Sequence, residues 1–176
     1  MGIPVGAAAQ DEIFAETQPV VLNAEEPDSE EVGELIFRGG LEIAPGEEEV
    51  GGISGLTWVQ DRLYAVSDDG HWLTIEPDEI DGQLIDLLSV ERGRLLDDRG
   101  KRLKGKEQTD AEAIERVAMG GWMVAFERNH RIVYYADLDQ AGAAVNEAEA
   151  ADALALVSEA APNAGIETLS FGLDTF

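Results

Sequence analysis

The sequence contains no cysteine and few basic residues: 12 Lys and Arg stand against 37 Asp and Glu, which gives a net charge of −25 over 176 residues. Without cysteine the chain has no disulfides, no thiolate metal ligands and no cysteine nucleophile. A surface this negative repels a phosphate backbone, which excludes a general nucleic-acid-binding protein. No apolar run approaches the ~18–20 residues of a spanning helix, so we expect no integral membrane protein.

Aromatic residues are also few, but three Trp, three Tyr, five Phe and 44% hydrophobic residues are enough for a folded core. Residues 1–34 are mostly polar and acidic, and we expect an acidic, flexible leader there, with one strand at Gln18–Leu22. The small residues Ala7–Ala9 resemble the end of a secretory signal, although a basic start is missing. A flexible tail and a signal remnant both stay open.

From about residue 35 to 176 the chain changes to short apolar runs rich in β-branched and aromatic residues, separated by Gly, Asp and Asn. This pattern predicts β-strands, with hairpin turns at Asp61-Arg62 and Asp81-Gly82. Helical periodicity occurs only in residues 145–159, where one short helix is possible. The fold class is therefore all-β.

Two stretches of the chain repeat each other. Gly52-Ile-Ser-Gly-Leu56, the strand Leu63–Asp68 and His71 are followed by Asp110–Ile114, the strand Trp122–Glu127 and His130, and the two starts, Gly52 and Asp110, are 58 residues apart. A third start, Gly165–Leu169, comes after another 55 residues. Both histidines follow an acidic residue by three positions, and we expect them to be equivalent.

A repeat of short antiparallel strands at this length is typical of β-propeller blades, which have four strands each. The sequence holds about two blades and the first strand of a third. An open arc leaves sheet faces and edges exposed. The sequence is therefore part of a longer ring, or several chains complete one another, or the fold is no ring; we expect the first, a partial propeller that is incomplete at its C-terminus.

Five segments, in order, resemble the bacterial phytase-like family named for "esterase-like activity of phytase": GGISGL (51–56), YAVSDDGHWL (64–73), the region 95–114, VAFERNHRI (124–132) and NAGIETLS (163–170). The resemblance implies a single-domain β-propeller that is usually exported and about twice this length. The family usually has Arg after the Ser-Asp pair, where this chain has Asp69.

Four acidic residues occupy equivalent places in the repeats. The innermost strands of propeller blades face a common axis, so we expect Asp68, Glu112, Glu127 and Glu167 to gather there, with Ser54 in the same position as Glu112. Several carboxylates stay ionised together only beside a cation, and hard oxygen ligands suit Ca²⁺. The alternative is that these acids cap strands, pair with arginines or face solvent.

Arg128 and Arg131 flank Asn129-His130 just after a strand, and their guanidinium groups suit recognition of a phosphate. An internal salt bridge to Glu127 or Asp68 is the alternative. His71 and His130 are candidate general acids, or else structural side chains. Ser54 lies in GISGL rather than G-x-S-x-G, which argues against a serine-esterase mechanism.

The segment Arg92–Lys106 carries seven of the 12 basic residues, and we expect it either to steer an anion or to pair with nearby acids.

Together with the equivalent acidic residues, the family resemblance implies a phytase-like, calcium-assisted hydrolase that acts on a small anionic ester or phosphoester. A non-catalytic ligand-binding propeller and an inactive truncated fragment are the alternatives. The resemblance favours a periplasmic or secreted protein; a cytoplasmic one is the alternative.

Overall fold

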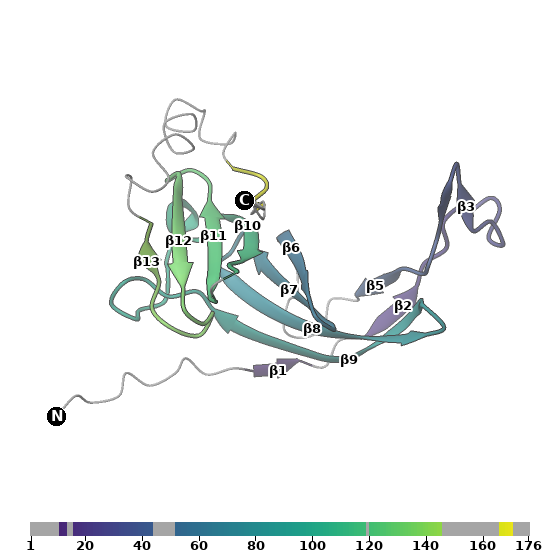
Figure 1. Ribbon diagram of the computed structural model, residues 1–176, viewed down its shortest axis with the longest axis horizontal. Helices are drawn as coiled ribbons and strands as arrows, with labels where there is room; N and C mark the ends of the chain where they lie inside the picture. Colours follow the sequence, from purple (N-terminus) through teal and green to yellow (C-terminus); the bar gives the residue numbers. More distant parts are fainter. Residues whose placement is uncertain (1–10, 14–15, 44–51, 119, 146–165, 171–176) are drawn as a thin grey trace.

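The computed structural model describes residues 11–13, 16–43, 52–118, 120–145 and 166–170 (Figure 1). Within them the regular structure is almost entirely antiparallel β-sheet, as the short apolar runs predicted. The strands are β1 (Asp11–Ile13), β2 (Thr17–Pro19), β3 (Glu31–Val32), β4 (Leu35–Ile36), β5 (Leu41–Ile43), β6 (Ile53–Val59), β7 (Arg62–Ser67), β8 (His71–Ile80), β9 (Gln83–Arg94), β10 (Ala111–Arg116), β11 (Trp122–Phe126), β12 (Arg131–Tyr135) and β13 (Ala143–Ala144). The helix considered at residues 145–159 lies, apart from Val145, outside the described residues, whereas α1 (Lys106–Thr109) is a single turn.

Two sheets form the body of the described chain. The first has the strand order β1-β9-β8-β7-β6, and the second has the order β10-β11-β12-β13. Each therefore contains four consecutive antiparallel strands, the arrangement of a propeller blade, and we call them blade 1 (β6–β9) and blade 2 (β10–β13). The long β8–β9 hairpin of blade 1 extends away from blade 2 toward the small β2–β5 and β3–β4 pairs (Figure 1).

The leader contributes strands to this architecture. β1 pairs with β9 at the outer edge of blade 1, and Ile13 is buried in the cluster formed with Ala65, Leu73 and Val90. The strand predicted at Gln18–Leu22 overlaps β2, which pairs with β5. Part of the segment expected to be a flexible leader is thus sheet structure, because its short apolar runs find partners far along the chain.

The hairpin turns follow the local sequence. Ile80 pairs with Gln83, so Asp81 and Gly82 form a two-residue turn, and both have positive φ, 54° and 74°. That backbone suits Asp-Gly and confirms the turn predicted there. At the β6–β7 turn, Val59 pairs with Arg62, so the turn is Gln60-Asp61, one residue earlier than predicted.

The repeat seen in the sequence is present in the backbone. In blade 1 the register shifts between Ile53 and Gly55, which makes Ser54 a β-bulge; in blade 2 it shifts between Ala111 and Ala113, which makes Glu112 the equivalent bulge. Bulges of this kind re-aim a side chain and occur beside functional sites. The two blades therefore share a β-bulge at the equivalent position as well as equivalent strands.

The expected equivalence of the two histidines is wrong. Val66 pairs with Trp72, whereas the equivalent Ala125 pairs with Ile132. The hairpin loop of blade 2 is therefore one residue longer, so that Arg131, and not His130, takes the place of His71. Both histidines follow an acid by three residues, but the next strand begins three residues after Asp68 and four residues after Glu127.

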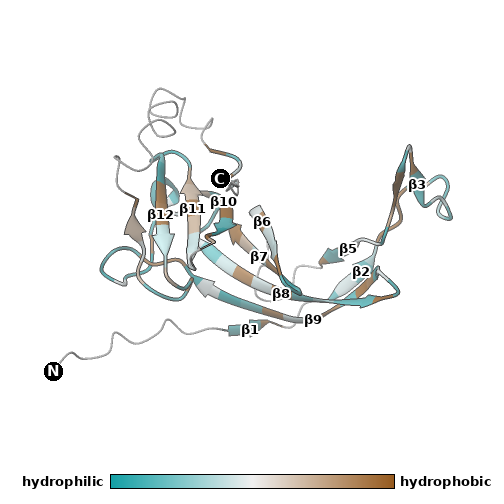
Figure 2. Cartoon of the chain, in the orientation of Figure 1, coloured by the Kyte–Doolittle hydropathy of each residue, from teal (hydrophilic) through white to brown (hydrophobic). Residues whose placement is uncertain are grey.

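A shared core joins the two blades. Trp72 and Leu95 of the first unit pack with Phe126 and Tyr135 of the second, and apolar stretches of β7, β10 and β11 meet between the sheets (Figure 2). Each large side chain buried here stabilises the fold by about 1.5–3 kcal/mol. Blade 1 packs on blade 2 along their innermost strands, β6 and β10.

The opposite face of β6 is open in the described part of the chain. Ile114 of β10 is buried between the blades, while Leu56, its equivalent on β6, is 55% exposed. This is the arrangement expected of two neighbouring blades from a propeller. None of the helices in the described residues is long and apolar enough to cross a membrane.

Gly55 permits the close approach of β6 and β10. A Cβ atom at this position would lie 2.8 Å from the Ala113 Cα atom and 3.0 Å from the Ile114 backbone nitrogen. We expect Gly55→Ala to lower the free energy of unfolding by about 1–3 kcal/mol, because backbone atoms must move apart. Denaturant-induced unfolding measures this; Leu56→Ala, on the exposed face, is the control and should change stability little. Equal effects of the two substitutions would contradict the packing described here.

Candidate functional site

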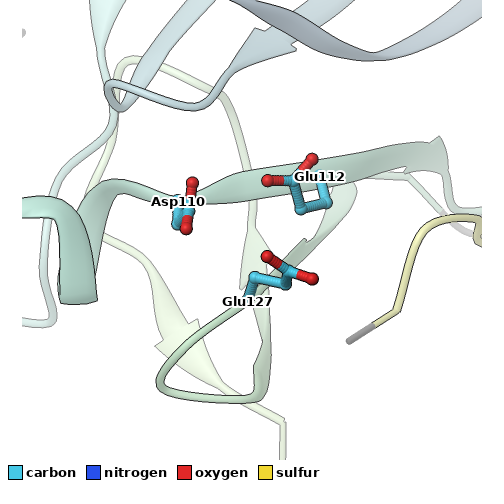
Figure 3. Close-up of side chains that lie close together, drawn as sticks. All are labelled: Asp110, Glu112 and Glu127. Atoms are coloured by element: carbon cyan, nitrogen blue, oxygen red, sulfur yellow. The ribbon is translucent and has the colours of Figure 1, made fainter. Parts of the chain in front are cut away.

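Three carboxylates meet at the inner end of blade 2. Asp110 follows α1, Glu112 is the bulge of β10, and Glu127 follows β11 (Figure 3). One oxygen atom from each lies within 4.8 Å of the other two. The Glu127 backbone N–H donates to the Asp110 carbonyl at 2.8 Å, which fixes the loop against the strand. We call these residues the carboxylate cluster.

Blade 1 has the same backbone with fewer acids. The Asp68 N–H donates to the Gly52 carbonyl at 2.9 Å, the counterpart of the bond between Glu127 and Asp110. Gly52 and Ser54 therefore stand where blade 2 has Asp110 and Glu112. The position is a common feature of both blades, and blade 2 concentrates the charge.

Two cations hold Asp110. The Lys106 ammonium lies 2.6 Å from Oδ1, and the Arg128 Nε lies 2.6 Å from Oδ2. The Asp110 side chain is only 3% exposed, and its burial alone would raise its pKa. The hydrogen bonds and charges of Lys106 and Arg128 outweigh burial and lower the pKa of Asp110.

Glu112 lies in a different electrostatic environment. Burial raises its pKa, and the negative charges of Asp110, Glu127 and Glu167 add to this effect. The Ser54 hydroxyl, which stabilises the carboxylate, opposes it. A nearby cation would therefore stabilise the ionised form of Glu112.

Asp68 lies next to the cluster but is not one of its three members. Its Oδ2 atom is 2.6 Å from the Lys106 ammonium, which also contacts Asp110, so that Lys106 bridges the two blades. The Thr109 hydroxyl donates to the Asp68 carbonyl at 3.3 Å. Asp68 as a metal ligand stays a prediction, and in this structure its carboxylate is an ion-pair partner.

Glu167 lies near strands β6 and β10. With Thr168 and Leu169 it lines a cavity of about 200 Å³ whose other wall includes Ser54 and Glu115. Its negative charge contributes to the raised pKa of Glu112. The structure thus brings together the equivalent positions of three repeats, although 166–170 form no strand.

The predicted arginine pair is divided between two places. Arg128 has a left-handed backbone, with φ of 56°, and turns to the cluster. Arg131 instead donates to the carbonyls of Gln108 at 2.6 Å and Asn129 at 3.1 Å. Its guanidinium carbon also lies 3.8 Å from the centre of the Phe126 ring. The two side chains do not form one clamp.

The candidate general acids also differ. His71 is buried, and its Nδ1 lies 2.6 Å from the Asp69 Oδ1, which also accepts the Ser67 hydroxyl. Burial lowers the pKa of His71, although Asp69 opposes this. The ring nitrogens of His130 are buried and have no hydrogen-bond partner among the described residues. His130 lies in the same loop as Glu127, whereas His71 belongs to the other blade.

Sequence reasoning missed Asp110 and Lys106. The signal for Asp110 was its place two residues before Glu112, where a strand directs side chains to one side. Lys106 precedes Asp110 by four residues, and the single turn of α1 brings their charges together. Neither the turn nor the pairing followed from the apolar pattern.

A protein-family model described as "Phytase-like: Esterase-like activity of phytase" matches residues 48–175, more than half of the chain. The matched region contains both blades and the carboxylate cluster. No curated protein and no solved structure matches the chain. The description of the family suggests an esterase-like hydrolase function.

The ion pairs of Asp110 make stability depend on pH. Because its pKa is lowered on folding, they stabilise the fold above the unfolded value of about 4 and are lost as the pH falls through the folded value. We expect Asp110→Asn to cost about 1.5–3 kcal/mol near neutral pH and less in acid. Urea-induced unfolding of the wild-type chain and of the Asp110→Asn variant, from neutral pH down into acid, measures this. Asp98→Asn, at an exposed site, is the control; a cost for Asp110→Asn that does not change with pH would refute the assignment.

Proposed function

Since the chain belongs to the Phytase-like family, we propose that it is a hydrolase of phosphate or other esters, assisted by Ca²⁺ at the carboxylate cluster. The observation that carries the proposal is the meeting of Asp110, Glu112 and Glu127 within 4.8 Å. The expected partner is a small anionic ester or phosphoester. The proposal extends to a periplasmic or secreted location, which the family resemblance favours.

The donor set suits a hard cation. All three cluster residues offer carboxylate oxygens, and Ca²⁺ takes ~6–8 oxygen ligands. Glu112 and Glu127 are the principal candidates, because both oxygens of Asp110 already contact cationic side chains. Glu167 and Asp68, which lie near the carboxylate cluster, are the further candidates. The chemistry that Ca²⁺ supplies when bound is polarisation of a phosphoryl or acyl oxygen and a lower pKa for water.

The side chains of the chain supply the other roles. Arg128 is partly exposed, and its guanidinium is positioned at the cluster by Asp110, so it is the candidate for holding the anionic group of the ester. His130 follows Glu127 by three residues and is the candidate that protonates the leaving group. His71, tied to Asp69 and made less basic by burial, suits this task less well.

One observation favours a second candidate function, a ligand-binding propeller without catalysis. Arg131 and His71, two of the four residues expected to handle the substrate, are engaged in contacts within the fold. In that case the cluster and its cation would serve structure and ligand binding alone.

The test uses the full chain with and without Ca²⁺. We expect Ca²⁺ at roughly a hundredfold excess over its dissociation constant to stabilise the fold by about 2.7 kcal/mol, a rise in melting temperature of about 5–10 °C. We also expect release of phosphate from an aryl phosphate, or of phenol from an aryl acetate. The double variant Glu112→Gln and Glu127→Gln should lose both effects, whereas Glu107→Gln, at an exposed site on α1, should keep them.

Each result decides between the candidates. Turnover that depends on Ca²⁺ and on the cluster supports the hydrolase. Stabilisation by Ca²⁺ without turnover of either ester overturns the hydrolase and favours the binding propeller. If Ca²⁺ does not change the melting temperature of the chain, the proposed metal site is wrong.

A further inference from the structure

A second cavity lies on the other side of the loop that carries His130. Its volume is about 350 Å³, within the range of small-molecule sites. It opens between the hairpin at residues 96–103 and the strands β12 and β13, and it shares no residue with the carboxylate cluster. Its lining consists of Leu96, Asp97, Asp98, Leu103, Gln108, Asn129, Arg131, Val133, Tyr135, Gly142 and Ala144.

Arg131 is the cationic group in this cavity. In the part of the chain that the structure describes, its guanidinium has two carbonyl partners and the Phe126 ring but no carboxylate partner. This contrasts with Lys106 and Arg128, whose charges both meet Asp110. Arg131 is half-buried, and loss of solvent lowers its pKa.

An unpaired guanidinium in a cavity has an affinity for anions. A chain with 37 acidic and 12 basic residues has many carboxylates to offer, yet none meets this cation among the described residues. Arginine has more N–H donors than the two carbonyl bonds use, so donors remain for a carboxylate or phosphate. The cost of burying the charge is offset when such an anion binds.

The hairpin that borders the cavity carries further basic residues. The side chains of Arg99, Lys101 and Arg102 are exposed on it, and Arg99 lies 4.0 Å from its neighbour Asp98. The acid Asp97 is engaged, because its Oδ1 accepts the backbone N–H groups of Arg99 and Lys101 at 2.9 and 2.8 Å. The segment Arg92–Lys106, which includes this hairpin, was expected either to steer an anion or to make ion pairs. Lys106 makes ion pairs with Asp68 and Asp110, and steering of an anion by the hairpin stays a prediction.

Part of the remaining lining is apolar. Leu96, Leu103, Val133, Tyr135 and Ala144 form this part, and the Tyr135 hydroxyl donates to the Leu96 carbonyl at 3.1 Å. A fully hydrated inorganic ion gains little from such a surface, whereas an organic body does. The cavity therefore combines the cationic group of Arg131 and an apolar surface with the polar side chains of Asp97, Asp98, Gln108 and Asn129.

We propose that this cavity binds a small organic anion, with a carboxylate or phosphate group on Arg131 and an apolar body against Leu96, Leu103 and Val133. Binding needs neither Ca²⁺ nor the carboxylate cluster, so the proposal goes beyond the hydrolase and does not depend on it.

The full chain, in buffer that contains EDTA, is titrated with benzoate, phenyl phosphate, inorganic phosphate and the neutral benzamide, and binding is measured by calorimetry. We expect saturable binding of benzoate or phenyl phosphate, or of both, and at least about tenfold weaker binding of benzamide and inorganic phosphate. The stronger of the first two identifies the preferred anionic group. Arg131→Met should weaken binding of that ligand at least about tenfold.

Arg131→Met could also disturb the loop that Arg131 holds, so a second variant tests the cavity without removing a contact. Ala144→Glu places a carboxylate at the mouth of the cavity and should weaken anion binding at least about tenfold. Ala143→Glu is its matched control, because Ala143 is the exposed neighbour on β13 whose side chain points to the other face, and it should bind as the wild type does. Absence of saturable binding, equal binding of benzamide, or equal effects of the two glutamates would overturn the proposal.

Discussion

The approach of β6 to β10 is the constraint on which the rest of the structure depends. Gly55 has no side chain, and its backbone rests against Ala113 and Ile114 of the next blade. This close contact allows the side chains of Trp72, Leu95, Phe126 and Tyr135 to pack into one core shared by the two sheets. It also determines chemistry, because the bulges that precede Gly55 and Ala113 direct Ser54 and Glu112 to the same end of the blades.

Packing at this end brings several carboxylates together, and two cations lie among them. Lys106 and Arg128 neutralise Asp110, and Lys106 joins Asp110 to Asp68 across the blades. Glu112 has the Ser54 hydroxyl but carries the repulsion of three neighbouring acids, and its pKa rises. The internal cations thus fix the geometry of the cluster, while Glu112 keeps an electrostatic demand for a further positive charge. A metal-assisted function is consistent with this division.

Local patterns in the sequence predicted what local physics decides. The β-branched runs became strands, Asp81-Gly82 became a turn, and the repeated segments became equivalent positions in two blades. What failed depends on one inserted residue or on distant pairing. The extra residue in the β11–β12 loop put Arg131 in the place of His71. The pairing of β1 with β9 joins residues some eighty positions apart, which no periodicity reveals. Asp110 was missed because its partners come from a single helical turn and a left-handed loop residue.

The two arginines of the β11–β12 region show why nearness in sequence does not make a common site. Arg128 has φ of 56° inside the loop, and its guanidinium turns back to Asp110. Arg131 begins β12, where the strand fixes its direction onto the Phe126 ring and toward Val133 and Tyr135. The loop that carries His130 therefore separates Arg128, which pairs with Asp110 at the carboxylate cluster, from Arg131, which has no carboxylate partner among the described residues. In a chain with 37 acidic residues, the proposed anion site depends on this separation.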